Sequence, residues 1–154
     1  HTYGKLVEYP IKTIEYLEQI AKKIKKFNGG LLTFDYGYDK KKSLDTLQSV
    51  KGHRYAAILS DPGKTDITSQ VNFKIFKNLF KSKNLQVEKI ITQNEFLQKM
   101  GILARAELLS KKMTFRKKVD MFYRLQKLLH PKEMGSLFKV MFVHKKNKKF
   151  SLGF

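Results

Sequence analysis

The residues best placed to do chemistry stand where an apolar run, residues 31–34, meets a loop. Asp35 and Tyr36 follow the run directly. Ligands of open α/β sheets bind at the carboxyl ends of strands, so a carboxylate and a phenol at this place could hold a polar substrate group. The alternative is a turn in which Asp35 accepts from nearby backbone N–H groups while Tyr36 packs on the core. The residues alone leave both interpretations open.

Other kinds of site have weaker signals. A nucleotide-binding domain needs a glycine-rich turn after its first strand, where backbone N–H groups can approach the ligand. Gly29 and Gly30 precede the apolar run instead, a position typical of a helix C-cap. His53, His130 and His144 have no His or Glu partner at metal-ligand spacing, so we expect them on the surface or in turns. The sequence therefore predicts no metal site and no cofactor-binding residues in this chain.

The elements that would position Asp35 and Tyr36 follow from hydrophobic periodicity. Residues 11–27 carry apolar side chains at three- and four-residue spacing, which predicts an amphipathic helix that begins after Pro10. Residues 31–34 are predicted to form a strand buried on both faces, and residues 37–63 a long, partly ordered loop. Further helices are predicted at residues 71–80, 93–100, 102–111 and 115–130, and further strands at residues 85–92 and 137–143.

This order of elements indicates the α/β class, with three strands and about five helices. Hydrophobic residues make up 42% of the 154 residues, which is enough apolar material for a folded core. A doubly wound sheet normally contains more strands than three. We therefore expect the chain to be one part of a larger α/β unit.

The formal net charge of +19 comes from 28 Lys and only 4 Arg. Specific nucleic-acid binding is not expected, because such sites favour the bidentate guanidinium of Arg. The lysines are spread along the chain, which favours a solvated surface over a binding groove. No apolar stretch reaches the roughly 18 residues of a membrane span, and the lack of Cys fits a reducing compartment. We therefore expect a cytoplasmic protein that does not enter a membrane.

Several short segments occur in an order shared with a known family. They are GGLLTFDYG at residues 29–37, DTLQ at 45–48, GHRY at 52–55, DPG at 61–63, DIT at 66–68, VNF at 71–73, QNEFL at 93–97 and MGSLFKV at 134–140. This set resembles the MidA family of class I S-adenosylmethionine-dependent methyltransferases. Asn72 departs from the family pattern, which commonly has Asp at that position.

The resemblance implies a Rossmann-like methyltransferase sheet in which residues 31–34, 85–92 and 137–143 are the fifth, sixth and seventh strands. The last of these would be antiparallel. Residues 1–144 would be the C-terminal portion of the methyltransferase domain, and residues 145–154 a basic tail. The glycine-rich cofactor loop would lie in an N-terminal half that is missing from this chain.

The same resemblance implies a cofactor and a substrate class. The cofactor of the family is S-adenosylmethionine, and the substrate is a protein, with arginine as the favoured target residue. Asp35, Tyr36, Asp66 and Thr68 would lie at the rim of the substrate side. Without the N-terminal half, the chain alone is not expected to bind S-adenosylmethionine or to transfer a methyl group. Whether this chain is an enzyme therefore stays open. The expected partners are that N-terminal half and a protein substrate.

A second interpretation is a non-enzymatic interaction module or split-gene remnant. Such a module would pair with a separate N-terminal half or bind an acidic partner. An exposed sheet edge and the high positive charge favour it. Nucleic-acid binding through lysine is a third interpretation, for which the sequence offers few arginines and no recognition motif.

Overall fold

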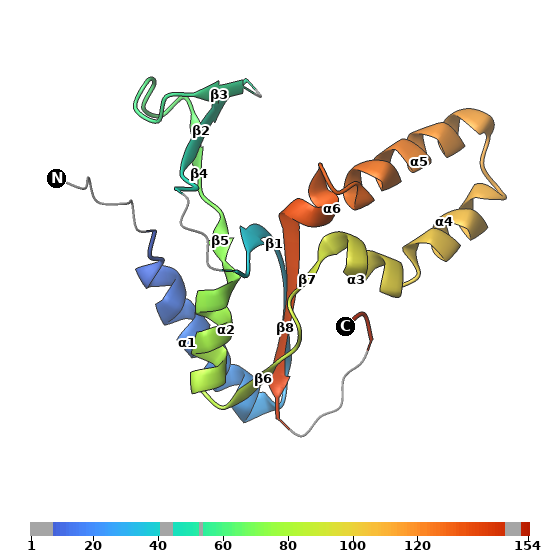
Figure 1. Ribbon diagram of the computed structural model, residues 1–154. Helices are drawn as coiled ribbons and strands as arrows, with labels where there is room; N and C mark the ends of the chain where they lie inside the picture. The colour runs from blue at the N-terminus through green and yellow to red at the C-terminus, as the bar shows by residue number, and fades with distance from the viewer. Residues whose placement is uncertain (1–7, 41–44, 53, 147–151) are drawn as a thin grey trace.

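The computed structural model describes residues 8–40, 45–52, 54–146 and 152–154, which form a mixed α/β fold (Figure 1). The helices are α1 (Ile11–Phe27), α2 (Phe73–Ser82), α3 (Gln93–Lys99), α4 (Ile102–Ser110), α5 (Phe115–Leu129) and α6 (Met134–Leu137). The strands are β1 (Gly30–Tyr38), β2 (Gln48–Lys51), β3 (Arg54–Ala56), β4 (Asp66–Thr68), β5 (Val71–Asn72), β6 (Leu85–Val87), β7 (Ile91–Thr92) and β8 (Phe138–Lys145). Each of the five predicted helices is present, with ends that differ by at most two residues.

Helix α1 has the amphipathic character that its sequence predicts. Leu17, Ala21 and Ile24 are buried, at a spacing that puts them on one face of the helix. The helix ends at Asn28, whose φ of 56° is left-handed and whose N–H donates to the carbonyl of Ile24. Asn tolerates this conformation better than most residues other than glycine, so the helix stops where the predicted cap lies.

The main sheet has the order β5-β1-β8-β6, and β7 also pairs with β8. β1 and β8 are antiparallel, from Gly30 opposite His144 to Tyr36 opposite Phe138. β6 and β7 are antiparallel to β8 as well. β5 adds only two parallel pairs, at the last two residues of β1. The last strand is therefore antiparallel to its neighbours, as the resemblance implies.

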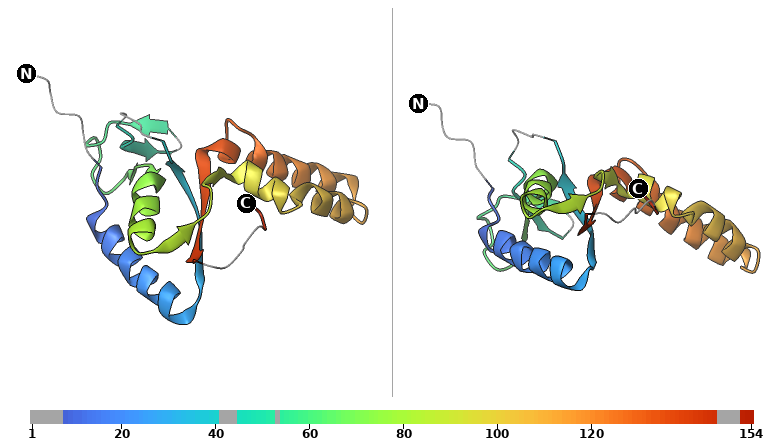
Figure 2. Two further views of the ribbon diagram at one scale, coloured as in Figure 1. Left: turned by 60° about the horizontal axis from the view of Figure 1, so that its bottom comes forward. Right: turned by 90° about the horizontal axis from the view of Figure 1, so that it is seen from below.

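Two apolar clusters lie on opposite faces of the main sheet. Successive side chains of a strand point to opposite faces. Met141 and Val143 belong to the cluster under α1 and α2, whereas Val140 packs with Phe96 of α3. Figure 2 shows α1 and α2 on one side of the strands and α3 on the other. The sheet is thus covered by helices on both faces.

A second sheet, with the order β3-β2-β4, falls mostly where the sequence predicts a loop. β2 is antiparallel to both neighbours, with Ser49 opposite Ala56 and Ile67. The prediction of three strands is therefore wrong. Strands of two to four residues carry too few alternating positions to be told from a loop, and β4 and β5 pair with strands that are not adjacent to them in the chain.

Two predicted strands differ in detail from the structure. β1 was expected to be buried on both faces, but Leu32 and Phe34 are 46% and 39% exposed, so that prediction is wrong. Residues 85–92 form two strands rather than one. The N–H of Glu88 donates to the carbonyl of Phe142 at 3.0 Å, and regular pairing resumes only at Ile91.

Two short elements beside the predicted helices were not expected. Val71 and Asn72 form β5 instead of the first residues of α2, and the side chain of Asn72 caps α2 by accepting from the backbone N–H of Lys74 at 3.2 Å. α6 has only four residues, too few for a helical period. Side-chain capping and tertiary contacts, rather than periodicity, set these ends.

The division at residue 144 into a domain and a basic tail stays a prediction. β8 continues to Lys145, and residues 147–151 lie outside the described residues. Phe154, at the end of the predicted tail, packs against Phe96 and Phe142, with ring centroids 5.3 and 5.9 Å apart. The described end of the tail therefore contributes to the cluster on the α3 side.

Candidate functional site

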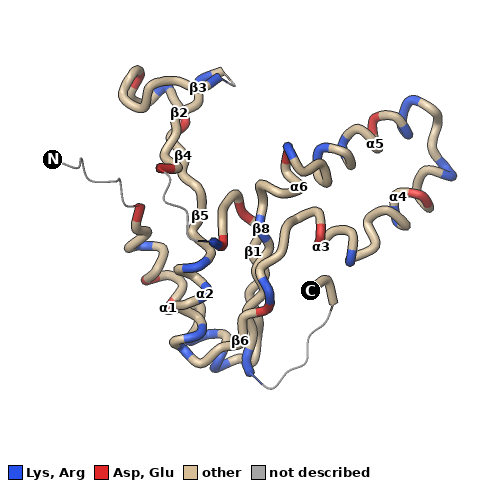
Figure 3. The backbone as a smooth tube through the Cα atoms, viewed as in Figure 1, with Lys and Arg blue, Asp and Glu red and all other residues tan. Residues whose placement is uncertain are grey.

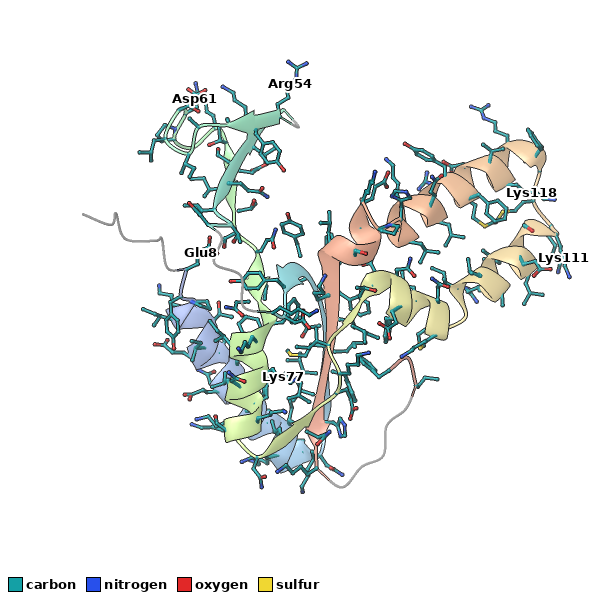
Figure 4. All side chains as sticks on the ribbon, in the orientation of Figure 1. Glu8, Arg54, Asp61, Lys77, Lys111 and Lys118 are labelled. Carbon is teal, nitrogen blue, oxygen red and sulfur yellow. The ribbon has the colours of Figure 1, made fainter. Side chains whose placement is uncertain are left out.

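A cleft of about 390 Å³ opens beside the carboxyl end of β1. Its walls are Glu8 and the start of α1, Asp35 of β1, and residues 69–72 between β4 and α2. Glu8 stands just before α1, below the three-stranded sheet (Figure 4). The cleft thus lies where ligands of α/β sheets bind, at the end of a strand that points into it.

The lining of the cleft has the opposite charge to the chain as a whole. Glu8 and Asp35 line it, and among the residues that the structure describes no Lys or Arg does. The described lysines and arginines lie along the helices, on β8, on the small sheet and in the connecting turns (Figure 3). Because nearby carboxylates favour positive charge, the cleft is electrostatically suited to a cationic group.

A chain of hydrogen bonds holds the walls of the cleft together. Both oxygens of the Glu8 carboxylate accept from Thr46, one from its backbone N–H at 2.9 Å and one from its hydroxyl at 2.6 Å. The Thr46 hydroxyl oxygen in turn accepts from the backbone N–H of Gln70 at 2.9 Å. The Gln70 side-chain amide donates to the phenol oxygen of Tyr36 at 2.9 Å. Four segments that are distant in sequence are therefore fixed relative to one another.

Asp35 and Tyr36, predicted as rim residues, lie together at this end of β1. Asp35 is exposed and lines the cleft, and one of its carboxylate oxygens also accepts from the backbone N–H of Tyr36 at 2.8 Å. The Tyr36 ring lies 6.1 Å from the ring of Phe138. Both the turn-forming contact and an accessible carboxylate are therefore present, and a substrate-binding role stays a prediction.

Asp66 and Thr68, the other two predicted rim residues, lie on β4 in the three-stranded sheet. Both are exposed, and neither lines the cleft beside β1. The Thr68 hydroxyl oxygen accepts from the side-chain amide of Gln48 at 3.2 Å. The structure therefore does not bring Asp66 and Thr68 together with Asp35, and their placement at a substrate rim stays a prediction.

Three residues of the site were missed by the reasoning about individual side chains: Glu8, Thr46 and Gln70. Glu8 and Thr46 are 38 positions apart, so no local pattern predicts their contact. The available signal was the family resemblance, because Thr46 lies in its DTLQ segment.

The histidines do not form a metal centre in the described part of the chain, where no group of three or more His, Cys, Asp or Glu side chains could hold an ion. His53 lies outside the described residues. His144 was expected on the surface or in a turn, and that prediction is wrong because only 4% of the residue is exposed. Its Nε2 lies 2.8 Å from Oε1 of Glu88, and its Nδ1 lies 2.9 Å from the carbonyl oxygen of Lys145. This polar pair contributes to the packing of β6 on β8.

The two described junctions at which a strand runs into a helix lack the features of a cradle for S-adenosylmethionine. Such a cradle needs glycine between a strand and the helix that follows it. β5 runs directly into α2 and β7 directly into α3, and neither junction has a glycine. The cofactor does not fit these junctions.

Residues 1–91 match the sequence profile of a family described as "Putative S-adenosyl-L-methionine-dependent methyltransferase". The chain belongs to this methyltransferase family. The match is consistent with the prediction that the chain corresponds to a C-terminal part of a MidA-type methyltransferase.

Individual relatives of this chain carry a more specific name than the family does. The chain is 30% identical over 122 residues to the zebrafish (Danio rerio) mitochondrial protein arginine methyltransferase NDUFAF7, and 30% identical over 125 residues to the human protein of that name. Both alignments cover 79% of this chain. The chain spans only 28% of the zebrafish protein and 27% of the human one.

Two solved structures from Burkholderia thailandensis share the fold of this chain. The first has a TM-score of 0.75 at 21% identity, and the superposition covers 91% of this chain and 38% of the matched chain. The second was determined with S-adenosyl-homocysteine bound and has a TM-score of 0.69 at 20% identity. This superposition covers 89% of this chain and 38% of the matched chain. The mixed α/β class predicted from the sequence is therefore confirmed.

The prediction of a cytoplasmic location is wrong by these comparisons, because the zebrafish, human and Drosophila melanogaster relatives are all named as mitochondrial proteins. A lack of Cys excludes disulfides but does not distinguish one compartment from another. Within the described residues, no helix is both long and apolar enough to cross a bilayer.

Proposed function

We propose that this chain is the C-terminal part of a protein arginine methyltransferase and that it needs an N-terminal half to bind S-adenosylmethionine and transfer the methyl group. The membership of the family and the names of the relatives support the activity. The short share of those relatives that the chain spans, and the absence of a glycine turn at the described strand-to-helix junctions, support the dependence on a second half.

The observation that carries this proposal is the open edge of β1. One edge of β1 pairs with β8 over residues 30–36, whereas the other edge pairs with β5 only at Gly37 and Tyr38. No other described strand joins β1, so within residues 30–36 the alternate residues whose N–H and C=O groups point away from β8 have no strand partner at that edge. A strand at the middle of a larger sheet would have a partner there.

The exposed side chains of β1 support the same conclusion. Leu32 and Phe34 point to one face of the strand, and both are more exposed than a central strand of a doubly wound sheet allows. A neighbouring strand with its crossover helix would cover the open edge and this face together. With β1, β8 and β6 side by side, the chain would supply the fifth, seventh and sixth strands of the complete sheet.

In the complete enzyme, the cleft beside β1 would form part of the substrate side. Asp35 would hold a substrate guanidinium through charge-assisted hydrogen bonds. The series of hydrogen bonds that joins Glu8 to Tyr36 would keep the Asp35 carboxylate at a constant position. Such positioning is a large part of catalysis by proximity. The names of the relatives also favour a mitochondrial location for this chain.

Calorimetric titration of S-adenosylmethionine tests the proposal. The titration is made into this chain alone and into the chain mixed with the N-terminal half of a methyltransferase domain from a full-length family member. We expect heat of binding only in the mixture. Binding to the chain alone would contradict the cofactor argument, and a stable complex of the halves that never binds the cofactor would favour the interaction module instead.

A further inference from the structure

The arm formed by α4, α5 and the turn between them leaves a large apolar surface without cover. The arm extends from the sheet on the side away from α1 (Figure 1). No residue of α5 is buried although the helix has 15 residues, and Ala106 is the buried residue of α4. Helices of this length are normally held by burial of an apolar face. An arm with so little burial has a face available to a partner.

A groove of about 530 Å³ runs between the two helices of the arm. Leu109 of α4 and Met121, Leu125 and Leu128 of α5 contribute its apolar floor. The positions on α5 repeat at four and three residues, so they follow one stripe along the helix. A stripe of this kind, facing a second helix across a gap, is the surface that receives the apolar face of an amphipathic helix.

The rim of the groove is basic. Arg105 and Lys117 are exposed along it, and Arg124 also lines it but pairs with Asp120 through Nε and Oδ2 at 3.0 Å. Residues 102–129 hold eight Lys and Arg against two Asp and Glu, a formal net charge of +6. Lys111 and Lys118 continue the positive charge to the tip of the arm (Figure 4). A second copy of this chain would bring the same charge to the groove and be repelled.

We propose that the groove between α4 and α5 binds an amphipathic helix with acidic flanks on a partner protein. The apolar stripe of that helix would cover the floor, and its carboxylates would lie against Arg105 and Lys117. This interaction is separate from the pairing at the open edge of β1, because the groove contains no residue of β1.

Fluorescence anisotropy with two designed peptides tests the proposal on the native chain. Both peptides carry the same stripe of Leu and Ile at helical spacing, one with Glu on its flanks and the other with Lys. The Glu peptide should bind at least about tenfold tighter at low salt, and this preference should shrink as salt screens the charges. Equal binding of the two peptides, or binding of neither, would overturn the proposal.

Charge-reversal variants locate the binding. Arg105→Glu combined with Lys117→Glu should weaken binding of the Glu peptide at least about tenfold and strengthen binding of the Lys peptide. Lys77→Glu combined with Lys81→Glu on α2 is the matched control, because it reverses the same number of charges away from the arm (Figure 4) and should leave both affinities within about twofold. An equal loss in the control would mean that net charge alone attracts the peptide.

Two other occupants of the groove would overturn the proposal if they were found. The first is a second copy of the chain, which analytical ultracentrifugation would detect as a dimer that Leu109→Gln abolishes. The second is the N-terminal half of the methyltransferase, which would displace the Glu peptide when it is added. A monomeric chain that keeps the peptide in the presence of that half would support the acidic partner.

Discussion

Replacement of Gly37 by Ala should separate β5 from β1 and so open the cleft. A Cβ at position 37 would lie 2.3 Å from the carbonyl oxygen of Val71 and 2.9 Å from Cε2 of Phe73. Ordinary contacts of a Cβ begin at 3.4 Å, so the Val71 backbone would have to move by about 1 Å. Phe73 is fully buried and cannot turn aside without disturbing the core. The two pairs between β1 and β5 are therefore expected to break.

The expected cost in free energy of unfolding is about 1–3 kcal/mol, the usual range for overpacking a closely packed site. For a chain of this size this corresponds to a fall in Tm of roughly 3–12 °C. Circular dichroism melts and urea unfolding measure both quantities. NMR shifts of the Gln70 side-chain amide would report whether its hydrogen bond to Tyr36 is lost at the same time.

Gly29→Ala is the matched control for this substitution. Gly29 lies just before β1, whereas Gly37 lies near its other end, and an added Cβ at Gly29 would have no atom within 4 Å. It should be neutral or slightly stabilising, because Ala restricts the unfolded chain more than Gly does. Two results would refute the argument from the close approach of β5. The first is a Tm of Gly37→Ala equal to that of the native chain, and the second is an equal fall in Tm in Gly37→Ala and Gly29→Ala.

Three further substitutions test other contacts. Thr46→Val removes the hydroxyl that Glu8 accepts from and should lower the free energy of unfolding by about 1–3 kcal/mol in urea titrations. Phe80→Ala should cost about 3–5 kcal/mol in the same assay, because Phe80 is fully buried between α2 and the sheet. The side-chain hydrogen bond from Lys83, together with its charge, lowers the pKa of Glu18. The stability that this pair contributes is present above the unfolded-state pKa of Glu18 and is lost as the pH falls through its folded-state pKa. Because Lys83→Met removes the partner that lowers this pKa, an NMR titration of the variant should give a higher pKa for Glu18.

Each of these substitutions has an outcome that would count against it. Thr46→Ser keeps the hydroxyl and should retain most of the stability that Thr46→Val loses, so equal losses would mean that the methyl group contributes as much stability as the hydrogen bond. A loss below about 1 kcal/mol in Phe80→Ala would mean that the cluster under α2 is not closely packed. An unchanged pKa of Glu18 in Lys83→Met would show that the ion pair between α1 and α2 does not persist in solution.

The helices were predictable from the sequence because a helix is specified by residues three and four positions apart. α1 covers residues 11–27 as its periodicity predicts, and its end at Asn28 follows from a local conformational preference. β1 and the antiparallel last strand, β8, were predicted as well, and the direction of β8 was predicted through the family resemblance. These features depend on short stretches of chain or on patterns shared by a family.

Tertiary contacts decided the rest. β4 and β5 are strands only through partners elsewhere in the chain. β1 is less buried than its apolar sequence predicts, and one of its edges is open. The cleft depends on Glu8, Thr46, Gln70 and Tyr36, four residues that are far apart in sequence and joined by hydrogen bonds. The sequence by itself determined the helices, the α/β class and the family, because those follow from local periodicity and from an order of short segments that resembles a known family. Only the folded chain decided which polar side chains share a cleft, since a contact across 38 positions has no local signature.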